Sequence, residues 1–415
     1  MPSVLGGLVR LVGGALGLSL TAGFAGPAGL SPGTHGPHGS PGLFGLSGAA
    51  GPAPSILTRP GNPANPAGCG TGEDDRGPIV VAHRGASAFR PEHTIPAYEA
   101  AVRMGADYVE PDVVPTKDHV LVVRHENELS RTTDVRRHPE FAGRRTTKIV
   151  DGVRRTGWFT EDFTLDELRT LGAVERFAAL RPASAVHDGL APIPTLDEVV
   201  GFAREAGVGV YVEIKHSTYF ASIGLPIEGP LLAVLTRHGW NDWCAPVFVQ
   251  SFETGNLARL RPLTRVRLTQ LIKGAGAPYD LVAAGDGRTY DDMVTPEGLG
   301  RVAEYADAIT VATSRVAPYG PGGAPGVPTS LVRDAHARGL QVHVATVRNE
   351  NTHLPREYRQ GDPADPEYPR ARGDVAGWLE RLYRLGVDGV FADDPEAARL
   401  ARDRVRLGTE AEGRG

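Results

Sequence analysis

Two histidines and a pair of carboxylates stand within one short stretch of the chain, between Ile79 and His125. Glu110 and Asp112 lie two positions apart in an apolar run, so both project from the same face of an extended strand. Carboxylates this close repel each other, and such a pair usually surrounds a hard divalent cation. His83 and His125 add imidazoles, which titrate near neutral pH and can share the general acid and base roles. The stretch therefore predicts metal-assisted acid–base chemistry.

Strands that alternate with helices must position these groups. The alternation, without hairpin signals, predicts an α/β fold closed as an eight-stranded parallel (β/α)8 TIM barrel. The eight predicted strands are Ile79–Ala82, Tyr108–Val114, Gly209–Ile214, Val247–Gln250, Arg265–Leu271, Ala308–Ala312, Gln341–Thr346 and Gly389–Ala392. The reactive side chains of such barrels gather at the carboxyl ends of the strands.

One long segment interrupts this alternation after the second strand. From about residue 127 to residue 194 the chain is charged and irregular, with one clear helix that begins at the capping box Thr164–Glu167. A second box, Thr195–Glu198, starts the next regular helix. We expect an inserted subdomain on the barrel rim, because a structureless loop of this length is unusual in a compact domain.

The third strand supplies a further carboxylate and a cation to the same end of the barrel. Glu213 and Lys215 stand two apart, and Arg84 follows His83 directly. Three carboxylates, Glu110, Asp112 and Glu213, suit calcium or magnesium, whereas zinc more often recruits histidine or cysteine. With the metal, Arg84 and Lys215 would form a charge clamp for an anionic substrate.

Several ordered motifs resemble the glycerophosphodiester phosphodiesterase family, in its periplasmic or secreted branch. The resemblance covers about residues 78 to 402. The matching motifs are His83-Arg84-Gly85-Ala86-Ser87, Pro91-Glu92-His93-Thr94, Glu110-Pro111-Asp112, Arg124-His125-Glu126-Asn127, Val212-Glu213-Ile214-Lys215, Gln250-Ser251-Phe252 and Gly389-Val390-Phe391-Ala392-Asp393. The form of the second motif and the long segment after His125 indicate the exported branch.

The resemblance implies metal-dependent hydrolysis of small glycerophosphodiesters to sn-glycerol 3-phosphate and an alcohol. It implies that His83 and His125 are catalytic, and it favours calcium, with magnesium as the alternative. In the family the insertion sits over the active-site mouth.

Other positions complete the predicted site. Gln250 and Phe252 are expected to line the substrate pocket, although core packing is an alternative for Phe252. Glu92 and His93 would orient the metal ligands. The family usually has an aromatic residue in place of Ala345, a departure that concerns the shape of the pocket.

Two other functions are compatible with the same residues. One is an exported phosphodiesterase that acts on a teichoic-type glycerol phosphate polymer of the cell wall, or on phospholipid. An open groove would favour polymer, and a mouth capped by the insertion would favour small diesters. The other is a non-catalytic binding protein, which predicts loss of a ligand or histidine, and none is missing.

The composition and the ends of the chain indicate the cellular compartment and limit the possible binding partners. The net charge of -5 gives no basic field, so nucleic acid binding is not expected. Residues 1–25 resemble a secretory signal peptide, too short for a stable membrane span, with an apolar tail or uncleaved anchor as the alternative. Residues 26–77 form a Gly/Pro-rich disordered linker, 78–405 the barrel domain, and 406–415 a disordered tail. A disulfide between Cys69 and Cys244 would fit a secreted protein.

Overall fold

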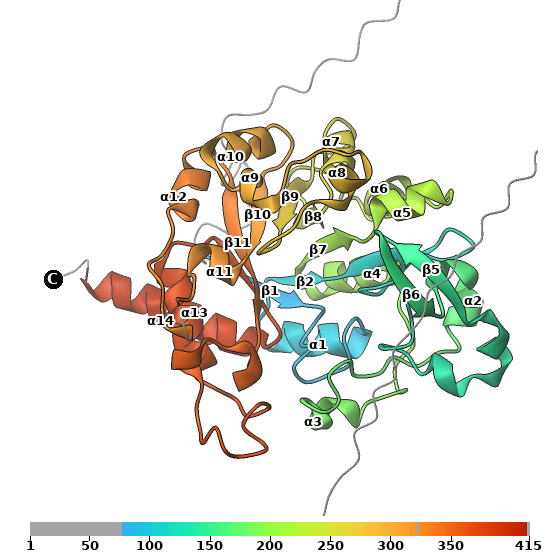
Figure 1. Cartoon of the computed structure of the whole chain (residues 1–415), viewed down its shortest axis with the longest axis horizontal. Coiled ribbons are helices and arrows are strands. Elements are labelled where there is room, and N and C mark those ends of the chain that lie inside the picture. The colour runs from blue at the N-terminus through green and yellow to red at the C-terminus, as the bar shows by residue number, and fades with distance from the viewer. Residues whose placement is uncertain (1–76, 321–322, 413–415) are drawn as a thin grey trace, which may run out of the picture. The chain divides into compact units, whose positions relative to one another are not determined.

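The computed structural model describes residues 77–320 and 323–412 of the chain (Figure 1). The predicted signal peptide and all but the last residue of the predicted linker lie outside this range, as does Cys69. The secretion and the disulfide therefore stay predictions. Among the residues that the structure describes, no helix has the length and apolar character that a membrane crossing requires.

The central sheet closes into a barrel of parallel strands. Its eighth position is shared by two short strands on either side of Pro111, and both of them pair with β7. Around the barrel the strands are β1 (Ile79–His83), β12 (Gly389–Ala392), β11 (Gln341–Val347), β10 (Ala308–Ala312), β9 (Arg267–Ile272), β8 (Val247–Ser251), β7 (Gly209–Ile214), and then β3 (Asp112–Pro115) and β2 (Tyr108–Glu110), which returns to β1. The predicted TIM barrel is confirmed.

Helices connect successive strands. The longer ones are α1 (Ile95–Arg103), α4 (Leu196–Ala206), α6 (Glu228–Arg237), α10 (Pro296–Ala303), α13 (Val375–Arg384) and α14 (Pro395–Glu412). Shorter helices are α2 (Leu165–Leu168), α3 (Pro182–Ala185), α5 (Ser217–Ser222), α7 (Gly255–Leu260), α8 (Tyr279–Ala283), α9 (Tyr290–Met293), α11 (Thr313–Val316) and α12 (Leu331–His336). Helix α14 continues through the predicted disordered tail as far as Glu412, because the residues after 405 include good helix formers and no proline.

Aromatic side chains fill the interior of the barrel. Tyr108, Tyr211, Phe248 and Phe391 are buried, and the rings of Tyr211 and Phe248 stack with centroids 4.5 Å apart. The Tyr211 hydroxyl is 2.8 Å from Nδ1 of His343, so its polar group has a partner inside the barrel. This layer makes the interior a packed core and gives the site at the strand ends a solid floor.

The insertion begins after β4 (Leu121–Val123), which runs antiparallel to β3. Both predicted capping boxes are present, at α2 and at α4. The sequence prediction missed a hairpin of β5 (Thr146–Val150) and β6 (Val153–Gly157). Its two-residue loop, Asp151-Gly152, has positive φ at both positions (48° and 74°), the geometry for which Asp-Gly is a strong signal.

The hairpin extends toward the carboxyl ends of the barrel strands. Nδ1 of His216, which follows β7, is 2.6 Å from Oδ2 of Asp151. Gly152 lies against the ring of Tyr279, in the loop region after β9. The hairpin and β7 are neighbours in Figure 1. The tip of the hairpin therefore contacts residues that follow β7 and β9.

Buried aromatic residues anchor the insertion. Trp158, Phe159 and Phe163 are all buried, and the Trp158 indole donates a hydrogen bond of 2.6 Å to the carbonyl of Phe141. The rings of Phe141 and Phe163 meet edge to face, with centroids 5.0 Å apart. These contacts favour anchoring over a role in closing the substrate pocket.

Candidate active site

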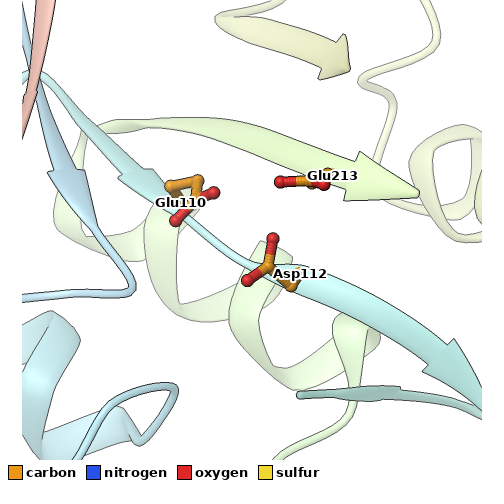
Figure 2. A group of neighbouring side chains, drawn as sticks. All are labelled: Glu110, Asp112 and Glu213. Carbon is orange, nitrogen blue, oxygen red and sulfur yellow. The ribbon is translucent and has the colours of Figure 1, made fainter. Parts of the chain in front are cut away.

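Glu110, Asp112 and Glu213 come together at the carboxyl end of the barrel (Figure 2). Strand register explains their meeting, since Glu110 pairs with His83 across β1 and β2, and Asp112 pairs with Glu213 across β3 and β7. One oxygen from each of the three carboxylates lies within 4.8 Å of the others, and all three residues are buried. The predicted metal ligands thus form one cluster.

The charges of this carboxylate cluster are poorly balanced within the protein. Burial, with Asp112 adjacent, raises the pKa of Glu110 well above its usual range and that of Glu213 to about 8. Burial acts on Asp112 in the same direction, but Lys215 and His93 hold its pKa well below its usual range. Oδ1 of Asp112 and Oε1 of Glu213 are buried and accept no well-directed hydrogen bond. Lys215 is the cation near these two oxygens, and three crowded, buried carboxylates with so little compensation fit a divalent cation.

His93 orients one of these carboxylates. Its Nε2 is 2.8 Å from Oδ2 of Asp112, and its Nδ1 is 3.0 Å from the Tyr98 hydroxyl, whose oxygen also lies 3.3 Å from the carbonyl of Glu110. Burial lowers the pKa of His93 to about 4, so the ring is neutral at pH 7 and donates a single proton to Asp112. The predicted orienting role of His93 agrees with these contacts.

Arg84 and Lys215 bring positive charge to the carboxylate cluster. Nζ of Lys215 is 2.6 Å from Oε1 of Glu213 and 3.3 Å from Oδ1 of Asp112. Nη1 of Arg84 donates to Glu92 at 3.0 Å, and its Nε is 3.7 Å from Oδ2 of Asp112. The two cations therefore lie where the sequence predicts a phosphate clamp.

His83 ends β1 beside the carboxylate cluster. Its Nδ1 is 2.7 Å from Oδ1 of Asp393, which directly follows β12. Burial and the charge of Arg84 lower the pKa of His83 to about 4, against the effect of Asp393. The imidazole is neutral at pH 7. Because its Nδ1–H donates to the Asp393 carboxylate, the lone pair of the ring is on Nε2.

His125 follows β4 and has a similar neighbour. Its Nδ1 is 2.9 Å from Oε1 of Glu126. Burial, with Arg84 and Lys215 nearby, holds the pKa of His125 well below its usual range. Arg84 therefore influences both histidines, and Lys215 acts on His125 and on the carboxylates, which places the predicted acid–base residues around one site.

The chain is similar to known proteins. Residues 83–397 match the model of the glycerophosphoryl diester phosphodiesterase family. The chain belongs to this family. It is 34% identical over 330 residues to a glycerophosphodiester phosphodiesterase of Arabidopsis thaliana, covering 76% of this chain and 83% of the relative. It is 27% identical over 360 residues to the glycerophosphodiester phosphodiesterase of Haemophilus influenzae, covering 77% and 88%.

A solved structure shares the fold. A phosphodiesterase of Oleispira antarctica, in complex with sn-glycerol-3-phosphate, superposes with a TM-score of 0.53 at 20% identity, covering 80% of this chain and 99% of that one. The predicted family, enzyme class and barrel are confirmed. The remaining residues of the site are therefore those of a glycerophosphodiester phosphodiesterase.

Gln250 and Phe252 have different surroundings in this phosphodiesterase. Nε2 of Gln250 donates to Oε1 of Glu110 at 3.2 Å, so Gln250 directly supports a predicted metal ligand. Phe252 is only partly buried, and its ring faces Nζ of Lys215 at 5.8 Å and Nζ of Lys273 at 4.6 Å. Phe252 thus lies at the mouth beside the predicted phosphate clamp.

The sequence prediction missed the partners of the two histidines. The position of Asp393 directly after an apolar strand is a signal that could have predicted its role, since His83 was predicted from the same kind of position. Glu126 stands directly after His125 in a matching motif. Arg176 and Arg181 contact these two carboxylates from the irregular insertion, and no local pattern marks them.

Proposed function

We propose that this enzyme hydrolyses small glycerophosphodiesters to sn-glycerol 3-phosphate and an alcohol, using a divalent cation and two histidines. The observation that carries the proposal is the buried cluster of Glu110, Asp112 and Glu213, with its oxygens within 4.8 Å of one another. The product-bound relative from Oleispira antarctica supports the same product. Family membership supports the reaction class.

The three carboxylates would hold the cation, with calcium as the proposed metal and magnesium as the alternative. Calcium takes six to eight oxygen ligands in loose geometry, which suits a cluster of carboxylates that leaves room for water and phosphate oxygens. When bound, the cation supplies stabilisation of the charge that develops on the phosphate.

The protein's own side chains carry the remaining steps. Arg84 and Lys215 bind the phosphate oxygens and stabilise the added charge in the transition state. One neutral imidazole of the pair His83 and His125 accepts the proton of the attacking hydroxyl, and the other, protonated when the anionic phosphate is bound beside it, donates that proton to the leaving alcohol oxygen. The attacker is water, or it is a hydroxyl of the substrate's glycerol, in which case water then opens the resulting cyclic phosphate to give glycerol 3-phosphate.

Small diesters suit the covered mouth better than a polymer does. The β5–β6 hairpin contacts His216 and Tyr279, beyond the ends of β7 and β9. A long glycerol phosphate chain would need an open groove across these strand ends.

We also propose export from the cytoplasm, supported by the apolar run with small residues near position 25.

Release of glycerol 3-phosphate from glycerophosphocholine tests the proposal. We expect a chelator to abolish turnover, calcium to restore it, and His125→Ala to lower kcat by roughly 10²–10⁴-fold in restored enzyme. Magnesium is added in a parallel sample. Full activity in chelator would refute the metal role, and activity on polymer or phospholipid alone would refute the substrate class.

A further inference from the structure

Two arginines of the insertion reach the residues beside the histidines. The side chains of Arg176 and Arg181 are only 5% and 4% exposed, although both lie in the irregular part of the insertion. Burial of a guanidinium is costly unless carboxylates and carbonyls satisfy its donors. The identity of those acceptors therefore shows what the two arginines hold in place.

Arg176 joins two carboxylates. Its Nε and Nη2 donate to the two oxygens of Glu92 at 2.8 Å and 2.6 Å, and its Nη1 and Nη2 donate to the two oxygens of Glu126 at 2.7 Å each. Oε1 of Glu126 in turn lies 2.9 Å from Nδ1 of His125, within ion-pair distance but without the hydrogen-bond geometry of the His83–Asp393 contact. A bidentate arginine fixes both the place and the plane of a carboxylate. Arg176 therefore fixes the group that faces the His125 ring.

Arg181 makes the equivalent connection on the other side of the site. Its Nη2 donates to Oδ2 of Asp393 at 2.5 Å, while its Nε donates to Glu350 at 2.5 Å and its Nη1 to the Ser87 carbonyl at 2.8 Å. The other oxygen of Asp393 is the one that meets Nδ1 of His83 at 2.7 Å. Both histidines thus have the same order of contacts: imidazole Nδ1, carboxylate, insertion arginine.

The backbone that carries the two arginines is itself held by local bonds. Glu175 accepts the Phe177 N–H at 2.8 Å and the Ser184 hydroxyl at 2.6 Å, and its own N–H donates to Asp188 at 2.7 Å. The N–H of Arg181 donates to the Phe177 carbonyl at 2.8 Å. These bonds close the segment into a compact loop, so the arginines reach the site from a fixed base.

We infer that Arg176 and Arg181 are positioning residues that hold the imidazoles of His125 and His83 through Glu126 and Asp393. This inference rests on the proposed acid–base roles of the two histidines. It gives the insertion a second task besides covering the mouth, because the insertion sets which ring nitrogen carries the proton and where the other one points.

Glutamine variants of the two arginines test this inference against a matched control. Arg402 is the control, since its side chain is 7% exposed and its Nη1 donates to Asp107 at 2.7 Å, at the opposite end of the barrel. Arg176→Gln, Arg181→Gln and Arg402→Gln are compared in the full chain with calcium. The measurements are kcat, KM, the thermal midpoint and the ¹⁵N spectrum of the histidine rings, assigned with His83→Gln and His125→Gln.

We expect Arg176→Gln and Arg181→Gln to lower kcat by about 10–100-fold with KM within about threefold of wild type. The ring signals of His125 should change in the first variant and those of His83 in the second. Arg348 also lies 3.2 Å from Oδ2 of Asp393, so we expect Arg181→Gln to have the smaller effect. Arg402→Gln should change the thermal midpoint and neither kcat nor the ring signals.

Unchanged ring signals in both variants overturn the inference, whatever happens to the rate. Arg176→Lys and Arg181→Lys are measured beside the glutamine variants, because lysine keeps the charge and loses the planar fork, and their ring signals decide where a glutamine variant does not fold. We expect them to retain more kcat than glutamine, and equal losses would also overturn the inference. If wild-type enzyme shows no turnover, the proposed function fails, while the ring signals still decide whether the arginines position the histidines.

Discussion

Two sets of carboxylates, one at each end of the barrel, differ in how far hydrogen bonds and basic side chains compensate their negative charges. At the amino ends of β2, β10 and β12, one aspartate precedes each strand, accepts a backbone N–H from the neighbouring strand and meets a basic side chain. The contacts are Asp107 with Val80 N–H (2.8 Å) and Arg402 (2.7 Å), Asp307 with Leu268 N–H (2.9 Å) and Arg261 (2.8 Å), and Asp388 with Val342 N–H (2.7 Å) and His336 (2.7 Å).

The cluster at the carboxyl ends has the opposite character. Glu110, Asp112 and Glu213 crowd together, and two of them have buried oxygens that accept no well-directed hydrogen bond. The aspartates at the amino ends therefore stabilise the fold, whereas the cluster at the carboxyl ends is destabilising until a cation joins it. The same isosteric change should have opposite effects on stability at the two ends.

Glu213→Gln should have the largest effect on activity. Loss of one metal ligand is expected to lower kcat/KM by about 10²–10³-fold, because charge stabilisation in the transition state weakens. In chelator, above the Glu213 pKa of about 8, the same variant should unfold at a higher temperature than wild type, since one buried charge is gone. Glycerol 3-phosphate release and thermal scans check both parts. A lower midpoint in chelator would contradict the idea of a strained cluster.

Asp307→Asn should affect stability and spare activity. The amide can still accept the Leu268 N–H, but it loses the charge that pairs with Arg261. We expect the free energy of unfolding to fall by about 1–3 kcal/mol, measured by urea denaturation. The kcat/KM should stay within about twofold of wild type. A large loss of activity at full stability would break the contrast between the two ends.

The pH dependence of the thermal midpoint should show the smallest effect. The pKa of Glu213 rises from 4.5 to about 8 on folding, so the folded state holds this proton more tightly than the unfolded state does. Its contribution to stability is present below the unfolded pKa and is lost as pH rises through the folded pKa. In chelator the midpoint should therefore fall by a few degrees between about pH 5 and pH 8, relative to Glu213→Gln. Calcium should remove this difference, and a flat profile in chelator would count against it.

The sequence was sufficient for the barrel and for the groups that end its strands. Spacing two apart predicted that Glu110 and Asp112 lie together, and they do, although Pro111 divides the predicted strand Tyr108–Val114 between β2 and β3. The partners of Arg176 and Arg181 could not be predicted this way, because Glu92 lies 84 residues from Arg176 and Asp393 lies 212 residues from Arg181. Such contacts arise only when the barrel closes, and no local pattern encodes them.

The two ends of the insertion meet on one short strand. The Val123 N–H donates to the Pro194 carbonyl at 2.9 Å, and Val122 bridges to Thr195. The entropic cost of closing a loop between adjacent points depends only weakly on the length of the loop. This segment can therefore be lengthened, shortened or exchanged during evolution while the barrel still folds. Each exchange would also replace the guanidinium groups next to the histidines. Divergence in this segment is thus a route by which related enzymes can change their rate of proton transfer together with their choice of substrate.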